Sequence, residues 1–356
     1  MSGARIVVGM SGGVDSSLAA ALLVEQGFEV VGVTLHLAGS ASRCCSLDDA
    51  DDARRVAEQL GIRFYVANQT REFRQEVMLP FADAYLEGRT PLPCARCNSR
   101  FKFDHLLARA RALGAERIAT GHYARVGRDA ASGAPVLRTS RDPAKDQSYF
   151  LFGLTQAQLE RAVFPLGELS KDEVRARARA LGLATAEKPE SQELCFVPDG
   201  DTGAAVERLR PERVPGAGEI VDEAGRVVGR HAGVHRYTVG QRRGLGVSGP
   251  APLYVKALDA ARNRVIVTDL EGLAARAGRV EQVSWISGQA PASAFEATVR
   301  IRYRHAGAAA CVTPDGDGGA ALAFHEPVRA LAPGQAAVFY RDDQVLGGGL
   351  LAGPRA

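Results

Sequence analysis

The residues near the N-terminus constrain the fold more than any other part of the chain. A β-branched run at Ile6–Gly9 leads through Met10-Ser11-Gly12-Gly13-Val14-Asp15-Ser16 into an alanine- and leucine-rich run. A strand, a glycine-rich turn and a helix in this order place backbone N–H groups and the positive end of a helix around one point. Glycine lets the backbone approach a ligand without a Cβ, and serine adds a hydroxyl donor. The pattern predicts an anion site at this turn.

The anion at this turn is predicted to be pyrophosphate. No Gly-Lys-Ser/Thr sequence follows, which excludes a Walker A loop and its lysine. The Ser-Gly-Gly-x-Asp-Ser sequence resembles the loop of the PP-loop ATP pyrophosphatases, which adenylate a carbonyl or carboxylate oxygen and release pyrophosphate. The resemblance implies ATP as a substrate. Asp15 is then expected to orient a donor or to hold Mg²⁺.

Strand-like and helix-like segments alternate over the first half of the chain. Patterns typical of strands occur at Ile6–Gly9, Val30–His36 and Arg63–Val66, and helical patterns separate them at Ser16–Glu25 and Ser46–Leu60. This alternation favours an α/β domain with a parallel sheet.

From about Gly203 the pattern changes to short β-branched runs interrupted by glycine and proline. A second series of such runs begins at Ala297–Tyr303 and ends in a glycine-rich tail. Helical periodicity largely disappears. We therefore expect three domains: a PP-loop domain at residues 1–202, a central β-rich domain at residues 203–280, and a C-terminal β-barrel at residues 281–356.

Composition excludes several classes of protein. Apolar residues make up 46% and charged residues 24%, which is typical of a globular protein. No stretch approaches the roughly 20 apolar residues that cross a bilayer, and the N-terminus does not resemble a signal peptide. We therefore expect no membrane contact and a cytoplasmic location, where six cysteines favour thiol chemistry over structural disulfides. The net charge of +3 is small, but basic residues outnumber acidic ones in residues 71–130 and 205–280.

The cysteines decide between the activities that such a loop supports. Cys94 and Cys97 lie ahead of a predicted helix and beside several basic residues, surroundings that lower a thiol pKa, and Cys195 follows far along in a loop-like segment. Two separated thiols suit a relay in which one carries a persulfide and the other resolves it. Adjacent Cys44-Cys45 is interpreted as incidental, and Cys311 as a core residue.

The motifs together resemble those of the bacterial tRNA-specific 2-thiouridylase family over nearly the whole chain. They are GMSGGVDSS at 9–17, CARCN at 94–98, ATGHYAR at 119–125, KDQSYFL at 145–151, SQELCF at 191–196, HRYTVGQRRGLG at 235–246 and PGQAAVFY at 333–340. The resemblance implies ATP-dependent 2-thiolation of the wobble uridine of tRNA, by adenylation of the 2-oxygen and sulfur transfer from a cysteine persulfide. It also implies glutamate, lysine and glutamine tRNAs as substrates, and an upstream protein as persulfide donor.

The same resemblance implies roles for individual residues. Cys97 is the expected nucleophile and Cys195 the expected persulfide carrier. The expected contacts to ATP are Gly9, Met10, Ser11, Gly12, Gly13, Val14, Asp15, Ser16, Leu35 and Gly121. The expected contacts to tRNA are Leu92, Pro93, Cys94, His122, Lys145, Asp146, Gln147, Arg302, Tyr303 and Gln335. The segment from Leu92 to Cys94 is expected to face the target base.

Two arginine-rich or lysine-rich segments interleave cations with aromatic residues, which suits phosphate contacts and base stacking. They are Lys145–Phe150 and Arg300–His305. In the second, alternation is expected to put Arg300, Arg302 and Arg304 on one side of a strand, as a row of phosphate ligands.

The sequence also leaves room for different chemistry at the cysteines. Cys94 stands where the family usually has aspartate, and Leu92 where it has asparagine. Cys94, Cys97 and Cys195 could therefore hold a [4Fe–4S] cluster with one open iron instead of passing a persulfide. A zinc site would need a fourth ligand, and none is predicted.

Three further activities fit part of the pattern. An amide-forming PP-loop synthetase would use the same loop without needing the cysteines. A thiolase acting at the 4-thiouridine position would need both. An RNA-binding module without enzymatic activity would need neither, and the intact Ser11–Ser16 sequence argues against it.

Overall fold

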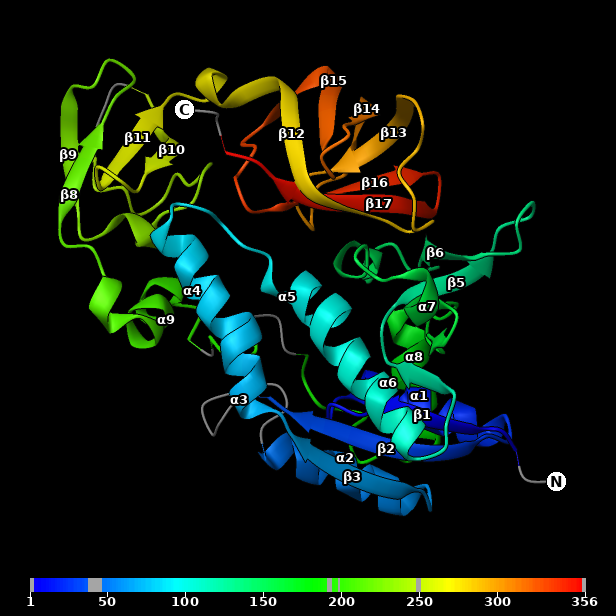
Figure 1. Ribbon diagram of the computed structural model, residues 1–356. Helices are drawn as coiled ribbons and strands as arrows, with labels where there is room; N and C mark the ends of the chain where they lie inside the picture. The colour runs from blue at the N-terminus through cyan, green and yellow to red at the C-terminus, as the bar shows by residue number, and fades with distance from the viewer. Residues whose placement is uncertain (1–2, 38–46, 191–193, 198, 248–250, 354–356) are drawn as a thin grey trace.

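The computed structural model describes residues 3–37, 47–190, 194–197, 199–247 and 251–353. The predicted features at Ser46, Cys44-Cys45 and Ser191–Glu193 lie outside these ranges. An N-terminal α/β unit carries a small β unit and a closed barrel on one side (Figure 1). Within the described ranges, every helix is too short or too polar to cross a lipid bilayer.

The N-terminal sheet has five parallel strands in the order β3-β2-β1-β4-β7. The strands are β1 (Arg5–Gly9), β2 (Glu29–His36), β3 (Arg63–Asn68), β4 (Arg117–Thr120) and β7 (Ala162–Val163). The chain moves outward from β1 to β3 and returns to the other side of β1 as β4. This change of direction opens a crevice at the carboxyl ends of β1 and β4, where ligands bind in open α/β sheets. The predicted parallel sheet is confirmed.

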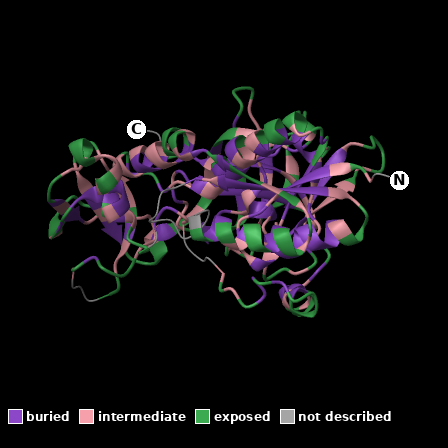
Figure 2. Cartoon of the chain, turned by 90° about the horizontal axis from the view of Figure 1, so that it is seen from below, coloured by how far each residue is buried: buried purple, intermediate pink, exposed green. Residues whose placement is uncertain are grey.

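Helices cover both faces of this sheet, because side chains alternate along each strand. Ile6 and Val8 of β1 face one apolar cluster, and Val7 faces the other. The first cluster is covered by α1 (Val14–Glu25), α2 (Leu47–Gln59) and α8 (Lys171–Ala180). The second is covered by α3 (Thr70–Phe73), α4 (Leu79–Leu86) and α6 (Phe103–Ala112). Buried residues line both layers (Figure 2).

Two long helical runs on the second face each contain a π-helical segment. One run joins α3 to α4 through η1 (Arg74–Met78), and the other joins α5 (Pro93–Arg96) to α6 through η2 (Cys97–Lys102). π-turns inside helices are rare and often mark functional sites. The η2 segment begins at one of the predicted catalytic cysteines.

The central unit is a four-stranded sheet in the order β10-β11-β8-β9. Its strands are β8 (Gly218–Val221), β9 (Val227–His231), β10 (Tyr254–Asp259) and β11 (Arg264–Thr268). The short helix α9 (Thr202–Leu209) precedes it, and Arg210 and Arg213 form ion pairs with Asp83 of α4. These ion pairs attach the central unit to the N-terminal one.

The C-terminal unit is a barrel of six strands that β12 and β17 close. The strands are β12 (Ala274–Trp285), β13 (Phe295–Arg300), β14 (Ala308–Pro314), β15 (Ala320–Arg329), β16 (Ala336–Arg341) and β17 (Gln344–Leu351). β17 also pairs with β6 (Pro135–Thr139) of the hairpin that β5 (Ala124–Arg128) begins. The predicted barrel is confirmed, and its sheet continues into the N-terminal unit. Strand β12 runs through residues 280 and 281, between which the sequence placed the boundary of the second and third domains.

One sequence-based expectation about the barrel is wrong. The strand expected at Ala297–Tyr303 ends at Arg300, so Arg302 and Arg304 lie exposed in a turn and the row of three arginines does not form. Val299 and Ile301 are buried in the barrel, and Arg300 between them points toward the N-terminal unit, where its Nη1 donates to Oδ2 of Asp146 at 3.0 Å. The glycine-rich tail is β17, whose pairing with both β12 and β16 overrides the low β-propensity of glycine.

The remaining elements are short connecting helices. They are α7 (Gln156–Leu159) and the 3₁₀ turns η3 (Ser148–Phe150), η4 (Pro211–Arg213), η5 (Val234–Arg236) and η6 (Glu271–Leu273).

Candidate active site

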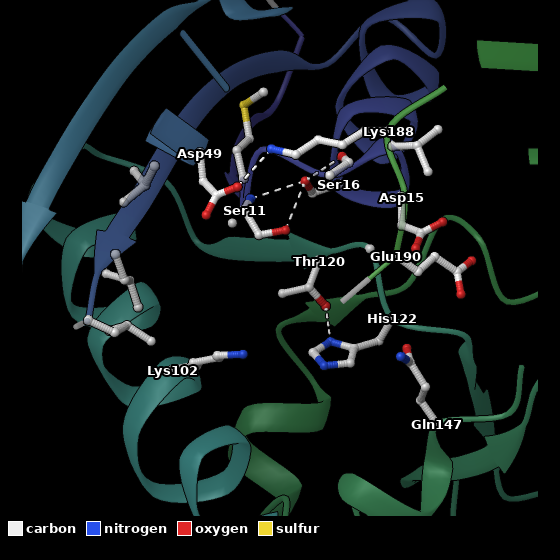
Figure 3. Close-up of a pocket in the computed structure, with 18 of the residues that line it drawn as sticks. Ser11, Asp15, Ser16, Asp49, Lys102, Thr120, His122, Gln147, Lys188 and Glu190 are labelled. Carbon is white, nitrogen blue, oxygen red and sulfur yellow. Dashed lines mark hydrogen bonds and ion pairs between the residues drawn. The ribbon is translucent and has the colours of Figure 1, made fainter. Parts of the chain in front are cut away.

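A cavity of about 300 Å³ opens at the carboxyl ends of β1 and β4, in the crevice that the topology creates (Figure 3). Most residues predicted to contact ATP line it. They are Gly9, Met10, Ser11, Gly13, Val14, Asp15, Ser16, Leu35 and Gly121. His122 and Gln147, predicted to contact tRNA, line the same cavity.

The loop between β1 and α1 requires glycine at position 12. Gly12 has φ of +72°, and a Cβ there would lie 2.2 Å from the carbonyl oxygen of Asp49. Ser16 Oγ accepts from the backbone N–H of Ser11 at 3.0 Å and donates to the carbonyl of Gly13 at 3.1 Å. Among the described residues, no side chain caps the N-terminus of α1. The first N–H groups of the helix are therefore available to an anion in the cavity.

The connection after β4 lies directly against this loop. A Cβ at Gly121 would lie 2.7 Å from the backbone nitrogen of Ser16. The missing side chain lets the two segments meet, so the cavity is bounded by the phosphate loop on one side and by residues 120–122 on the other.

A chain of charged groups leads away from Asp15. Its Oδ1 accepts hydrogen bonds from Tyr123 Oη and from Lys171 Nζ, both at 2.7 Å. Lys171 Nζ also lies 2.6 Å from Glu190 Oε1, and Lys145 Nζ lies 2.7 Å from Glu190 Oε2. Burial by itself raises the pKa of Glu190, but the hydrogen bonds from Lys145 and Lys171 outweigh it and lower that pKa. Four alternating charges thus link the phosphate loop to Lys145.

A second lysine fixes the rim of the cavity. Lys188 Nζ lies 2.7 Å from Oδ1 of Asp49 and 2.6 Å from Oδ2 of Asp52 (Figure 3). Burial lowers the pKa of Lys188, but hydrogen bonds to the two carboxylates raise it above its usual value. Lys188 is therefore held to α2. In Figure 3, Lys102 points into the cavity from η2.

His122 is a neutral side chain in this cavity. Its Nδ1 lies 2.8 Å from Thr120 Oγ1, and its ring contacts those of Phe103 and Phe164. Burial, helped by the charge of Lys102, lowers the pKa of His122 to about 3. The imidazole can exchange hydrogen bonds with a ligand at neutral pH but contributes no charge.

The structure brings the segments of Cys97 and Cys195 into one apolar cluster. Cys97 is buried in it, and half-buried Cys195 packs against it. The ring of Phe73 contacts Phe196, next to Cys195, with centroids 5.8 Å apart, and contacts Phe101 in η2 with centroids 5.6 Å apart. An aromatic bridge therefore joins two segments that are far apart in the sequence.

The barrel docks beside the helix start that carries Leu92, Pro93 and Cys94. The carbonyl of Thr90 accepts from Gln335 Nε2 at 3.1 Å, and its N–H donates to the carbonyl of Pro333 at 2.7 Å. Nearby, the ring of Tyr303 lies 4.5 Å from that of Phe150. Predicted tRNA contacts from two domains thus lie around the first turn of this helix.

Other predicted tRNA contacts have different surroundings. Asp146 is buried, and its carboxylate accepts from Ser148 Oγ and Arg300 Nη1. Gln147 Oε1 accepts from the N–H of Tyr123 at 3.0 Å. Arg302 is exposed.

Several polar residues of the site were missed by reasoning from the sequence. They are Asp49, Thr120, Lys171, Lys188 and Glu190. Lys188 and Glu190 stand immediately before the SQELCF motif, which is the one sequence signal that could have indicated them. Lys171 follows the capping serine of α8 and looks like an ordinary first-turn residue.

Sequence comparison decides the family. The protein named tRNA-specific 2-thiouridylase MnmA of Geobacter metallireducens is 52% identical, with 97% of this chain and 96% of that protein covered. The proteins of the same name from Magnetococcus marinus and Acidobacterium capsulatum are 51% and 49% identical, each with 97% of this chain and 98% of the relative covered. This chain belongs to the tRNA-specific 2-thiouridylase family. The resemblance drawn from the motifs is confirmed.

Three domain models match along this 2-thiouridylase family member. A tRNA methyl transferase HUP domain matches residues 4–199, a tRNA methyl transferase PRC-barrel domain residues 206–269, and an aminomethyltransferase beta-barrel domain residues 276–351. Among solved structures, a 4-thiouridine synthetase–RNA complex with bound ATP is 16% identical and covers 59% of this chain and 51% of its own, with a TM-score of 0.34. A likeness at that score carries no inference about ligands.

Proposed function

We propose that this protein is an ATP-dependent tRNA sulfurtransferase that converts the wobble uridine of tRNA to 2-thiouridine. The observation that carries the proposal is the η2 segment, which begins at Cys97 in the apolar cluster and ends at Lys102 in the cavity. One helical run thus connects the cysteine predicted to take part in sulfur transfer to the cavity predicted to bind the nucleotide. Family membership supports the thiolation reaction, and an amide-forming reaction has no such support.

In the first step the uridine 2-oxygen attacks the α-phosphorus of ATP. The bond from this oxygen to phosphorus forms, the bond from the α-phosphorus to the bridging oxygen breaks, and pyrophosphate leaves. The uncapped N–H groups at the start of α1 and those of the loop at 12–13 are proposed to stabilise the charge on the departing pyrophosphate. Asp15 would hold Mg²⁺ in the cavity, and the ion would neutralise negative charge on the phosphates.

In the second step sulfur replaces the activated oxygen. The terminal sulfur of a persulfide on Cys195 attacks carbon 2 of the base, and the Cys97 thiolate then attacks the Cys195 sulfur. The old sulfur–sulfur bond breaks, a Cys97–Cys195 disulfide forms, and the electron pair left on the transferred sulfur forms the thiocarbonyl as AMP leaves. An external persulfide donor loads Cys195, and a thiol reductant restores both thiols afterwards.

The RNA is proposed to lie across the helix start at Leu92–Cys94, between the N-terminal unit and the barrel. Lys145, Arg302 and Tyr303 are the proposed contacts to its backbone and bases, and His122, Gln147 and Gln335 are proposed to border the target nucleotide. The glutamate, lysine and glutamine tRNAs are the proposed substrates.

Cys97 and Cys195 are proposed to pass sulfur, and neither they nor Cys94 are proposed to hold a cluster. Across the described ranges, no group of three or more His, Cys, Asp or Glu side chains is arranged to share a metal ion. A cubane cluster needs several thiolates directed at one point.

The test is nucleoside mass spectrometry on unmodified glutamate tRNA incubated aerobically with protein, MgATP and a persulfide donor. Wild type is compared with Cys97→Ser, Cys195→Ser and the control Cys311→Ser, whose cysteine lies on barrel strand β14. We expect 2-thiouridine from wild type and the control only. Full turnover by Cys195→Ser would overturn the relay. Activity that returns only after anaerobic iron–sulfur reconstitution, and that requires Cys94, would establish the cluster instead.

A further inference from the structure

The carboxylate of Glu190 is shared between two lysines that belong to different parts of the site. Oε1 lies 2.6 Å from Lys171 Nζ, and Oε2 lies 2.7 Å from Lys145 Nζ. The Lys171 side chain is only 10% exposed, whereas that of Lys145 is 34% exposed. Lys145 is therefore more accessible than Lys171 to a phosphate from solvent.

The inner lysine is shared in the same way. Lys171 Nζ bridges Glu190 to Oδ1 of Asp15, in the predicted pyrophosphate loop, and lies over the ring of Tyr123 at 5.7 Å. Lys171 and Glu190 thus each divide their attraction between two oppositely charged neighbours. A change at one end alters the strength of the contacts at the other.

We propose that Glu190 is a positioning residue that couples RNA binding at Lys145 to the binding of MgATP at Asp15, through Lys171. This inference rests on the proposed function. It assigns Glu190 and Lys171 roles in communication between the two substrate sites, in addition to the residues already expected to contact either substrate.

The sign of the coupling follows from the charges. A phosphate that pairs with Lys145 competes with Glu190 for its ammonium group, which leaves Glu190 to interact more strongly with Lys171. Lys171 then interacts less strongly with Asp15, so an oxygen of that carboxylate becomes available to Mg²⁺. Because linkage is reciprocal, MgATP that engages Asp15 must tighten RNA binding by the same factor.

Glu190 is also suited to this role by its place in the chain. It lies five residues before Cys195 and directly follows the Lys188-Pro189 pair, and Lys188 is anchored to Asp49 and Asp52 of α2. One end of this segment is thus fixed to the rim of the cavity, while Glu190 contacts both charged partners. In Figure 3, Glu190 and Asp15 lie on the same side of the cavity.

The test measures binding and not turnover. The dissociation constant of unmodified glutamate tRNA is determined with and without Mg²⁺ and a non-hydrolysable ATP analogue, and that of the analogue with and without tRNA. We expect each ligand to tighten the other about 5–10-fold in the wild type, within the usual range of coupling between sites. In Glu190→Gln the factor should fall to about 1, and tRNA alone should bind about 2–5-fold more tightly, because Lys145 loses its internal partner.

One variant serves as a control, and another tests the same link from the RNA side. Glu187→Gln removes the same charge three residues away, from an exposed glutamate paired with Arg179, and should keep the wild-type coupling factor. Lys145→Met should weaken tRNA binding and abolish the coupling, and adding Glu190→Gln to it should leave tRNA affinity unchanged. Lys145 is half-exposed, so this variant tests the same link if Glu190→Gln does not fold.

Either of two outcomes would overturn the inference. One is a coupling factor in Glu190→Gln equal to that of wild type, and the other is an equal loss in Glu187→Gln. A merely structural role for Glu190 predicts weaker binding of both ligands, not tighter tRNA binding. If wild type shows the coupling but forms no 2-thiouridine, the proposed function fails while this inference stands.

Discussion

The hydroxyl of Tyr123 donates a hydrogen bond to Oδ1 of Asp15 at 2.7 Å, although 108 residues separate the two. Tyr123 is buried, and its burial and the nearby carboxylate raise its pKa far above the usual range, so it remains a neutral donor. The contact fixes the rotamer of the one carboxylate in the predicted pyrophosphate loop. Asp15 is therefore oriented before any nucleotide binds.

Tyr123→Phe should impair the ATP step without unfolding the protein. The substitution keeps the ring and removes one hydrogen bond to a charged acceptor, a loss of about 1.5–3 kcal/mol at that contact. We expect tRNA-dependent AMP formation to fall about tenfold, since a misplaced carboxylate no longer positions Mg²⁺. Tyr254→Phe, on β10 of the central unit, is the matched control. Unchanged AMP formation in Tyr123→Phe would show that the hydroxyl has no part in positioning Asp15.

Gly12→Ala should abolish nucleotide binding, and Gly27→Ala should not. Both glycines have positive φ, +72° and +83°, so both substitutions carry the backbone strain of about 1–2 kcal/mol. Only at Gly12 would the new Cβ also clash with the carbonyl of Asp49, whereas no atom of the described residues lies within 4 Å of a Cβ at Gly27. Calorimetric titration with MgATP separates the two effects. Equal ATP affinity in both variants would mean that the loop relaxes freely.

The phosphate loop could be predicted from the sequence because its function depends on local backbone geometry. Its strand, glycines and helix are contiguous, and Asp15 falls where the motif places it. The contacts of Asp15 could not be predicted, since Lys171 is 156 residues away and belongs to a helix whose first turn looks unremarkable. Such partners are set by how α1 and α8 pack on one face of the sheet. No periodicity in the sequence encodes that pairing.

The same distinction explains the error at Arg300–Arg304. Alternating arginines fit the period of a strand, so the sequence favoured continuation. After Arg300 the chain leaves the sheet: Arg300 pairs with the buried carboxylate of Asp146 in the N-terminal unit, and the ring of Tyr303 packs against that of Phe150. Tertiary contacts here override a local pattern. For Cys97 and Cys195 the sequence predicts the chemistry, whereas the apolar cluster that they share is set by the fold.

His122 should make stability depend on pH. Its pKa is about 3 in the folded protein and near 6.5 when unfolded, so the unfolded chain binds more protons between these values. The stability associated with the neutral imidazole is present above pH 6.5 and is lost as the pH falls toward 3. His122→Gln should therefore lose less unfolding free energy than wild type between pH 7 and pH 5, as measured by urea denaturation. His325→Gln, at an exposed histidine, should behave as wild type.

Arg300→Met tests the junction between the barrel and the N-terminal unit. Arg300 lies over the ring of Tyr340 at 4.6 Å, and methionine keeps most of that packing while removing the charge paired with buried Asp146. An uncompensated buried carboxylate costs several kcal/mol, and because Arg300 is partly exposed we expect a loss of about 2–3 kcal/mol in unfolding free energy. Urea denaturation measures this loss.

The loss of unfolding free energy in Arg300→Met should come mainly from the Asp146 carboxylate, which the substitution leaves without its charged partner. Asp146→Asn added to Arg300→Met should then recover part of the stability, because the amide carries no charge and its oxygen can still accept from the N–H groups of Ser140 and Ser148. If the double variant is less stable than Arg300→Met, the carboxylate is stabilised by these local donors alone and the inter-domain pair contributes little. In the expected case Asp146 affects RNA binding by holding the barrel in place, and its substitution should weaken tRNA affinity only as far as it loosens that junction.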